Sequence, residues 1–254
     1  MPACKVKAEN RICLVTIDRP PVNATNRETY DEIRDIFYAL DRRNDIKVVI
    51  LTGAGKVFMA GNEIGEFTKF QTASECTEYY DTIRNAYLAV KNCRCPVIGA
   101  VNGTAVGAGV AFAGCCDVLV AAEGAKFILS EIKAGIIGAD GFASLLVPEK
   151  VLRYMAFSGN PVSAEQIAVW GGIWKVVPQK ALLDTAFEIA REFTRNARRA
   201  LILWKESLNR NFEHRLAEKF NNDLLATIAY QPYHDFREAV AALMEKRRPA
   251  YDDQ

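Results

Sequence analysis

The fold is decided by residues 97–122, which read VIGAVNGTAVGAGVAFAGCCDVLVAA. Two short apolar runs enclose a glycine-rich turn and a segment of small residues, a pattern that predicts a strand, a tight turn, a helix and a second strand. Glycine and alanine at such a turn allow a ligand to approach the main chain. They also leave the first amide N–H groups of the helix unpaired and directed at that ligand.

Three interpretations fit this stretch. A dinucleotide-binding fingerprint is opposed by the spacing: Gly107 and Gly109 fit its first two glycines, but Phe112 occupies the third position. Glu123 also follows too early for the acidic residue expected about 20 residues on. An oxyanion hole and the close packing of a helix on a sheet both remain open. Taken alone, the stretch favours packing.

A second stretch changes this balance. Residues 47–53, KVVILTG, have the composition of a buried strand, and residues 54–64, AGKVFMAGNEI, form a small-residue turn that leads towards a helix. Two such units in one chain can each supply one N–H to a single oxygen, which is the arrangement of an oxyanion hole.

With these motifs the chain resembles the crotonase family, the enoyl-CoA hydratases and isomerases. The residues that carry the resemblance are LTG (51–53), FMAGNE (58–63), AVNG (100–103), GAG (107–109), CD (116–117) and SEIKAGI (130–136). The resemblance extends from IDRP (17–20) to EKRRP (245–249), nearly the whole chain. The order of the motifs makes the signal specific.

Composition limits the class of protein. The chain has 254 residues, 50% of them hydrophobic, and can bury a large core. Its 32 basic and 31 acidic residues leave a net charge of +1, which argues against nucleic-acid or anionic-membrane partners. No apolar run reaches the length of a membrane span, and residues 1–5 do not resemble a signal peptide. We therefore expect a cytoplasmic protein.

The seven cysteines are an odd number without framework spacing, and we expect them to be reduced and buried. Cys93-x-Cys95 and the pair at 115–116 are too close for an ordinary metal pair, and His214 and His234 are distant in sequence. We therefore expect no metal site.

Periodicity and capping signals predict the order of elements along the chain. Strands are expected at 11–17, 47–52, 97–101, 117–122 and 173–177. Helices are expected at 26–43 (with Thr25-x-x-Glu28 as a capping box), 72–90, 141–157, 163–172, 182–193, 201–208, 216–230 and 236–246. We attribute the tyrosines at 79, 80 and 87 to packing rather than to an acyl pocket.

Alternating strands and helices followed by helices alone predict an α/β core with an all-helical C-terminal part. The crotonase resemblance implies a more particular architecture. Residues 1–196 would form a spiral of ββα units with two nearly perpendicular sheets and the acyl-CoA site. Residues 197–254 would form a helical region that builds homotrimers, which commonly pair into hexamers.

The resemblance also implies the chemistry. The family stabilises an enolate at an acyl-CoA thioester with two main-chain amides, which correspond to Asn62 and Ala108 here. Alanine replaces the usual glycine at 108, but its N–H still donates if φ is negative. The implied substrate-binding positions are Phe58, Met59, Ala60, Gly61 and Gly107, with Lys246, and Arg247 beside it, near the CoA phosphates. No separate cofactor is expected, because CoA is part of the substrate.

The proton-transfer residues depart from the two-glutamate pattern of the family's hydratases. Glu131 matches one glutamate, but the other position is Ala111, which cannot carry a proton. A single carboxylate suffices for a 1,3-proton shift in a 3-enoyl thioester. Asp140, before Gly141, is either an ordinary turn residue or a second acid that restores hydration or dehydration, and both interpretations stay open. Glu63 is expected to be structural.

We therefore expect an enoyl-CoA hydratase/isomerase-like enzyme in which Glu131 is the general acid/base. The alternatives are a hydrolase or decarboxylase that uses the same oxyanion hole, and a catalytically silent CoA-binding protein, which the alanine at 111 also allows.

Overall fold

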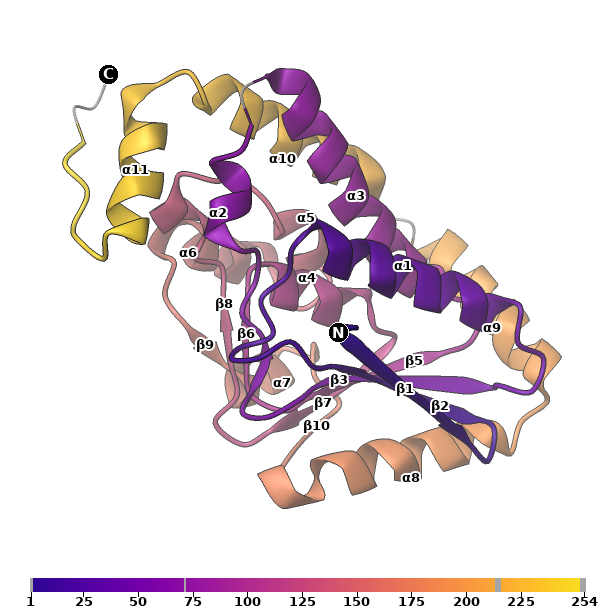
Figure 1. Cartoon of the computed structure of the whole chain (residues 1–254). Coiled ribbons are helices and arrows are strands. Elements are labelled where there is room, and N and C mark those ends of the chain that lie inside the picture. The colour runs from indigo at the N-terminus through magenta and orange to yellow at the C-terminus, as the bar shows by residue number, and fades with distance from the viewer. Residues whose placement is uncertain (1, 71, 213–215, 252–254) are drawn as a thin grey trace.

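The computed structural model describes residues 2–70, 72–212 and 216–251 and contains two β-sheets (Figure 1). The large sheet has the order β1 (Cys4–Glu9), β2 (Ile12–Ile17), β3 (Val48–Gly53), β5 (Val97–Val101), β7 (Val118–Ala122) and β10 (Lys175–Val177). The small sheet has the order β4 (Val57–Met59), β6 (Thr104–Val106), β8 (Lys126–Ile128) and β9 (Val162–Ser163). The pairs β1–β2 and β8–β9 are antiparallel and the others are parallel.

From β3 to β8, consecutive strands alternate between the two sheets. β3, β5 and β7 belong to the large sheet, and each is followed by a short strand, β4, β6 or β8, in the small one. The turn between β5 and β6 passes so close to the preceding unit that a Cβ on Gly103 would lie 2.0 Å from the Lys56 carbonyl oxygen. Only glycine allows that approach. The repeated strand pairs confirm the predicted crotonase-like spiral.

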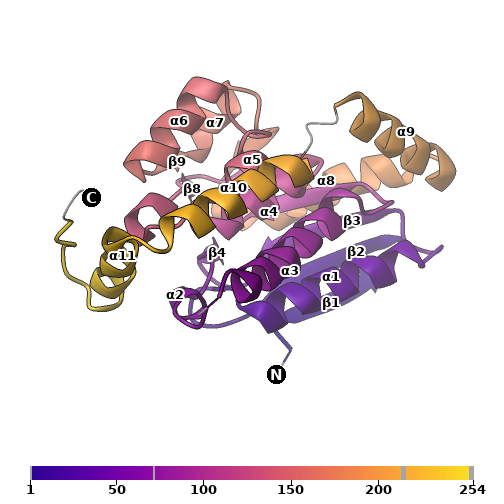
Figure 2. The same cartoon turned by 90° about the horizontal axis from the view of Figure 1, so that it is seen from above.

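Helices cover both faces of the large sheet (Figures 1 and 2). The helices of the core are α1 (Arg27–Asp41), α2 (Ile64–Phe67), α3 (Ala73–Lys91), α4 (Ala108–Cys115), α5 (Asp140–Ala143), α6 (Glu149–Ser158), α7 (Ala164–Val169) and α8 (Leu182–Thr194), with 3-10 turns η1 (Glu131–Ala134) and η2 (Gln179–Ala181). α1 and α3 pack together on one face, while α8 contacts β3, β5 and β7 from the other. Because both faces of the sheet are covered, all six residues of β3 are buried.

Three local expectations need correction. The first strand is paired with an additional edge strand, β1, whose polar sequence carries no apolar run: only Cys4 of its six residues is buried. α1 is capped by Asn26, whose Oδ1 accepts from Thr29 N at 3.0 Å, and not by Thr25. The helix expected at 141–157 is split into α5 and α6 around Pro148, which becomes the N-cap of α6.

Two predicted helix starts are confirmed. Thr72 and Glu75 form a reciprocal capping box at α3, and Ser163 and Gln166 form another at α7.

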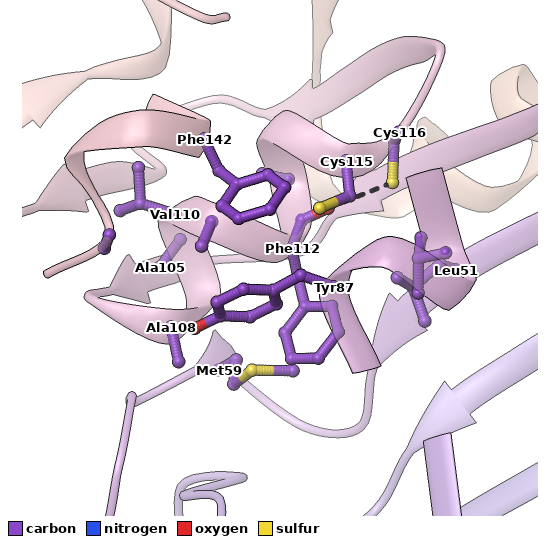
Figure 3. Close-up of a cluster of buried hydrophobic side chains, with 14 of the residues drawn as sticks. Leu51, Met59, Tyr87, Ala105, Ala108, Val110, Phe112, Cys115, Cys116 and Phe142 are labelled. Carbon is purple, nitrogen blue, oxygen red and sulfur yellow. Dashed lines mark hydrogen bonds between the residues drawn. The ribbon is translucent and has the colours of Figure 1, made fainter. Parts of the chain in front are cut away.

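An aromatic cluster fills the space between α3, α4 and α5 (Figure 3). The ring centroid of Tyr87 lies 4.8 Å from that of Phe112 and 4.9 Å from that of Phe142. The ring of Tyr30 stacks on that of Phe112 at a centroid distance of 6.1 Å. Cys116 Sγ donates to the Phe112 carbonyl oxygen at 3.4 Å. This cluster holds α4, and with it the turn that precedes α4, at a fixed position on the small sheet.

The C-terminal part is helical where it is described, as predicted: α9 (Arg198–Asn211), α10 (Leu216–Tyr230) and α11 (His234–Met244). α10 packs against α3 and α5, and its Phe220 and Leu224 belong to the main hydrophobic core (Figure 2). None of the described helices has an apolar stretch of the length that crossing a bilayer requires. The expected division at residue 196 and the role in trimers stay predictions.

Phe112→Ala is expected to lower the free energy of unfolding by about 3–5 kcal/mol, because it removes a fully buried ring from the aromatic cluster. Denaturant titration measures the loss. Phe157→Ala is the matched control: that ring is 73% exposed, and its removal should have little effect. Equal losses in the two variants would contradict the assignment of the cluster as the core.

Candidate active site

The site lies where three neighbouring parallel strands of the small sheet end. β4, β6 and β8 are adjacent, and the chain that leaves each of them delivers one predicted site residue: Asn62 after β4, Ala108 after β6 and Glu131 after β8. Ligands of parallel sheets bind at this carboxyl edge, because the turns that follow neighbouring strands converge there.

The Asn62 turn is held on both sides by Thr25. Thr25 N donates to the Gly61 carbonyl oxygen at 2.7 Å, and Glu63 N donates to the Thr25 carbonyl oxygen at 2.8 Å. The Asn62 side chain is fixed as well, because its Oδ1 accepts from Tyr30 Oη at 2.5 Å. Between these bonds the Asn62 N–H has no acceptor within residues 2–70, 72–212 and 216–251. It is therefore free to donate to a ligand.

The Ala108 turn presents a second amide beside the first. Gly107 adopts φ +51°, and Ala108 follows as the first residue of α4, where φ is negative and an alanine is unstrained. A first-turn N–H has no acceptor inside its own helix, and Ala108 N finds none elsewhere in the described part of the chain. A Cβ on Gly61 would lie 3.8 Å from Ala108 N, so the two turns touch.

The carboxyl group of Glu131 lies over Gly107. A Cβ on that glycine would be 2.5 Å from Glu131 Oε1, so a side chain at 107 would displace the carboxyl group from this position. Glu131 Oε2 is shielded from solvent and has no hydrogen-bond partner among the residues that the structure describes. An unpaired buried carboxyl oxygen is costly, and it is typical of a group that acts on a ligand.

Burial, together with a smaller contribution from the negative charge of Asp140, raises the pKa of Glu131 to about 8. At neutral pH a substantial part of the population is therefore protonated. A carboxyl group whose pKa lies near the working pH can both accept and return a proton.

Asp140 is the first residue of α5 and follows Ala139, which adopts the left-handed conformation with φ +67°. Non-glycine residues adopt this conformation rarely, and it clusters at functional sites. Asp140 Oδ1 is shielded from solvent and, among the described residues, has no partner. The carboxyl group is thus buried near Glu131; that it carries a proton in catalysis stays a prediction.

The cleft between these turns encloses about 130 Å³. Its lining combines the three strand-end segments with α2 and α11: Ala60, Gly61, Asn62, Ile64, Phe67, Val106, Gly107, Ala108, Ser130, Glu131, Lys133, Ala134, Ile136 and Leu243. A smaller hollow of about 20 Å³ continues inward along Tyr80, Tyr87 and Phe220. These two tyrosines therefore belong both to the core and to the inner wall.

The predicted CoA-binding residues fall into two groups. Ala60 and Gly61 line the cleft, whereas the side chains of Phe58 and Met59 are fully buried below it in the core. Neither Phe58 nor Met59 therefore presents a surface to the cleft, and their part in CoA binding stays a prediction.

The two basic residues expected at the CoA phosphates differ. Arg247 is engaged by Glu238 and Glu245. Lys246 is exposed and comes three residues after Leu243, which lines the cleft. Of the two, Lys246 therefore fits the predicted contact with the CoA phosphates better than Arg247.

Sequence reasoning missed Asp223. This residue of α10 is only 5% exposed and lies within hydrogen-bonding reach of Asp140. In the sequence it is one acidic residue of an amphipathic helix about 80 positions from Asp140, and no local signal separates it from a solvated one.

Asp140→Asn is expected to lower the pKa of Glu131 from about 8, because it removes the neighbouring negative charge while burial stays the same. Carbon-13 NMR of glutamate-labelled protein follows the titration, and the spectrum of Glu131→Gln assigns the signal. Glu149→Gln, on the exposed side of α6, serves as the control and should leave it unchanged. An unshifted Glu131 midpoint in Asp140→Asn would show that the two carboxyl groups do not interact.

Known proteins resemble the chain over most of its length. A family model described as enoyl-CoA hydratase/isomerase matches residues 7–254. The chain is 34% identical over 209 residues to the (7aS)-7a-methyl-1,5-dioxo-2,3,5,6,7,7a-hexahydro-1H-indene-carboxyl-CoA hydrolase of Mycobacterium tuberculosis, covering 82% of this chain and 85% of that protein. It is 30% identical over 254 residues to the 1,2-epoxyphenylacetyl-CoA isomerase of Escherichia coli, covering 96% and 95%.

A solved enoyl-CoA hydratase from Mycobacterium avium subsp. paratuberculosis has the same fold, with a TM-score of 0.87 at 23% identity over 99% of both chains. The family model and the two relatives cover most or nearly all of the chain. The chain belongs to the enoyl-CoA hydratase/isomerase family, the crotonase family, whose members act on CoA thioesters.

Proposed function

We propose that this crotonase-family enzyme holds the thioester oxygen of an acyl-CoA between the N–H groups of Asn62 and Ala108 and moves a proton on the adjacent carbons with Glu131. One observation carries the proposal. A shielded carboxyl oxygen without a protein partner lies in the same cleft as two main-chain amides that also lack acceptors within the described residues.

The two amides would act mainly in the transition state. When a proton leaves the carbon next to the thioester, negative charge moves to the thioester oxygen, and fixed donors stabilise it more than the neutral carbonyl. The partial positive charge at the start of α4 favours the same charge. Because Thr25, Tyr30 and the α4 packing fix both turns, little reorganisation is needed.

The proton transfer needs only one carboxylate. Ionised Glu131 would take a proton from C2 of a 3-enoyl thioester, and the electron pair left behind would delocalise through C1 onto the thioester oxygen and through C3=C4 onto C4. The protonated Glu131 would then return the proton to C4, giving the 2-enoyl isomer with no net change in charge. Ala111 is fully buried within α4 and offers no second acid, so the structure favours isomerisation over two-glutamate hydration.

Asp140 offers a variant of this mechanism. Its buried carboxyl group near Glu131 could exchange a proton with a second carbon or with water, which would support hydration or dehydration of a divergent substrate. The main chain at Ala60 and Gly61 would receive the CoA moiety and Lys246 its phosphates.

Homotrimers, alone or paired as hexamers, remain part of the proposal. Large apolar side chains are exposed on the side of α7 and α9, among them Trp170, Trp174 and Trp204, and such surfaces mark interaction sites. Light scattering that finds a monomer would exclude these assemblies.

Seven buried free thiols are compatible with the expected cytoplasmic, reducing environment.

Hydrolysis is the second candidate. It is favoured by the relative in Mycobacterium tuberculosis, which is named as a hydrolase of an indene-carboxyl-CoA compound. In this reaction Glu131 would take a proton from the water molecule that attacks the thioester, and not from C2. The proposed oxyanion hole would be the same.

Glu131→Gln is expected to reduce double-bond migration in 3-enoyl-CoA, and exchange of the C2 proton with solvent deuterium, by about 10²–10⁴-fold, because the amide cannot accept a proton. In the wild type the rate should rise with pH up to about 8, where Glu131 becomes ionised. Glu149→Gln is the control. Free CoA is measured in the same reactions: its release without migration would favour the hydrolase, and binding without any turnover would indicate a silent CoA-binding protein.

Ala108→Pro is expected to reduce the rate by about 10²–10³-fold, because it removes one N–H of the proposed oxyanion hole. Proline is tolerated at the first position of a helix, where the N–H has no intrahelical partner. Ala108→Gly keeps the N–H and is the matched control, and circular dichroism with thermal unfolding checks that both variants fold. If folded Ala108→Pro is as active as Ala108→Gly, Ala108 N does not bind the substrate oxygen.

A further inference from the structure

α10 forms a roof over the inner end of the cleft and is fixed to the loop that leads to Asp140. Thr227 Oγ1 donates to the Ile137 carbonyl oxygen at 3.0 Å and accepts from Ile137 N at 3.2 Å. It also lies 3.1 Å from Tyr80 Oη, which donates to the Ile137 carbonyl oxygen at 3.2 Å. These bonds set the distance between α10 and the start of α5.

Asp223 lies one helical turn before Thr227, on the same face of α10. Its side chain is buried, and in the described ranges Asp223 Oδ2 and Asp140 Oδ1 are both shielded oxygens without a donor. The carboxyl groups of Asp223 and Asp140 are within hydrogen-bonding reach of each other, and Glu131 is close enough to act on both electrostatically. Three acidic groups therefore meet in one buried cluster.

No cation neutralises this cluster in the described part of the chain. From α3 the titratable groups that face Asp223 are Tyr80 and, next to it, Cys76, and both are neutral in their ordinary state. The nearby bases are engaged elsewhere: Arg84 with Asp81 and Asn221, and Lys133 with the Gly159 carbonyl oxygen. Three carboxylates cannot all be ionised at such distances, so the cluster must retain a proton.

We propose that Asp223 is a positioning residue: it keeps this proton and donates an O–H hydrogen bond to the carboxylate of Asp140, which holds Asp140 beside Glu131 in the cleft. The inference rests on the proposed function for the role of Glu131. At neutral pH the proton stays with the pair, so Asp140 and Asp223 together carry a charge of −1 while Glu131 reacts.

The electrostatics agree with this geometry. Burial, followed by the hydrogen bond with Asp140 and the charges of Asp140 and Glu131, raises the pKa of Asp223 from 3.8 to about 9. Asp223 is therefore protonated at neutral pH and can serve as a donor.

The proposal makes a prediction about stability that needs no substrate. Between pH 3.8 and about 9 the folded chain binds one more proton at Asp223 than the unfolded chain, so the free energy of unfolding falls as the pH rises through this range. The stabilisation from this proton is complete below pH 3.8 and is lost by about pH 9. Asp223→Asn keeps a donor, the side-chain amide, but cannot titrate. The Tm of the wild type is therefore expected to fall relative to that of Asp223→Asn by about 3 °C per pH unit between pH 6 and 9.

The matched control is Asp184→Asn, which neutralises an exposed aspartate on α8, and its Tm should follow the wild type at every pH. Asp140→Asn provides a second measurement, since removing the partner should weaken the dependence while Asp223 and its burial stay intact. Parallel Tm curves for the wild type, Asp223→Asn and Asp140→Asn would overturn the shared proton, whatever the enzyme turns out to catalyse.

The catalytic part of the inference is tested by comparing two substitutions. Asp223→Asn still donates to Asp140, whereas Asp223→Leu leaves that carboxylate without a donor. We expect proton exchange at C2 to be at least about tenfold faster in Asp223→Asn than in Asp223→Leu at pH 7, and the alkaline fall of the wild-type rate near pH 9 to disappear in Asp223→Asn. Equal rates in two folded variants would overturn the positioning role. If the wild type turns over no acyl-CoA, the proposed function fails while the Tm result still stands.

Discussion

The site depends on the contact between the Glu131 carboxyl group and the main chain of Gly107. A side chain at 107 would collide with Oε1 of Glu131, and the left-handed backbone at this glycine also starts α4 with the Ala108 N–H unpaired. One residue therefore fixes both the acid and one of the two donors. The position of the second donor, Asn62, follows from the pairing of β4, β6 and β8, because these strands carry Asn62 and Glu131 to the same edge of the small sheet.

Burial without a counter-ion gives this site its particular chemistry. In an exposed position Glu131 would be ionised and hydrated at neutral pH, and it would be a weak base. Enclosed by apolar side chains and near Asp140, its pKa is raised to about 8, and its unpaired oxygen remains available to a substrate. The cost of burying such groups is met by the aromatic cluster and the large core around them, which keep the strand ends from relaxing.

The position of Ala111 separates the fold from the reaction. α4 packs through its small residues against Phe142 and the small sheet. The fully buried alanine at 111 fits this packing, but it cannot supply the second acid that two-glutamate hydration uses. The turns at Asn62 and Ala108, the proposed oxyanion hole, are independent of this residue. A family can therefore keep one thioester-binding frame and change its reaction through the acids that face the acyl group, and its relatives named as hydrolase and isomerase are compatible with that division.

The sequence by itself determined the strand-turn-helix units, most helices and the motifs at 51–63, 100–109 and 130–136, because these depend on periodicity and on local glycine chemistry. It missed β1, whose polar residues form a strand only through pairing with β2, and it placed one helix across Pro148. Resemblance of the motifs, rather than periodicity, supplied the spiral and the residues of the site.

Only the tertiary structure decided what the acids do. The burial of Asp140 and the approach of Asp223 depend on α10 crossing the cleft, a contact between segments about 80 residues apart. The pKa of a carboxyl group is set by what surrounds it in space, and a linear sequence does not contain that information. The amides at 62 and 108 are of the same kind: their residue types are ordinary, and the packing of two turns leaves both N–H groups without an acceptor in the described parts of the chain.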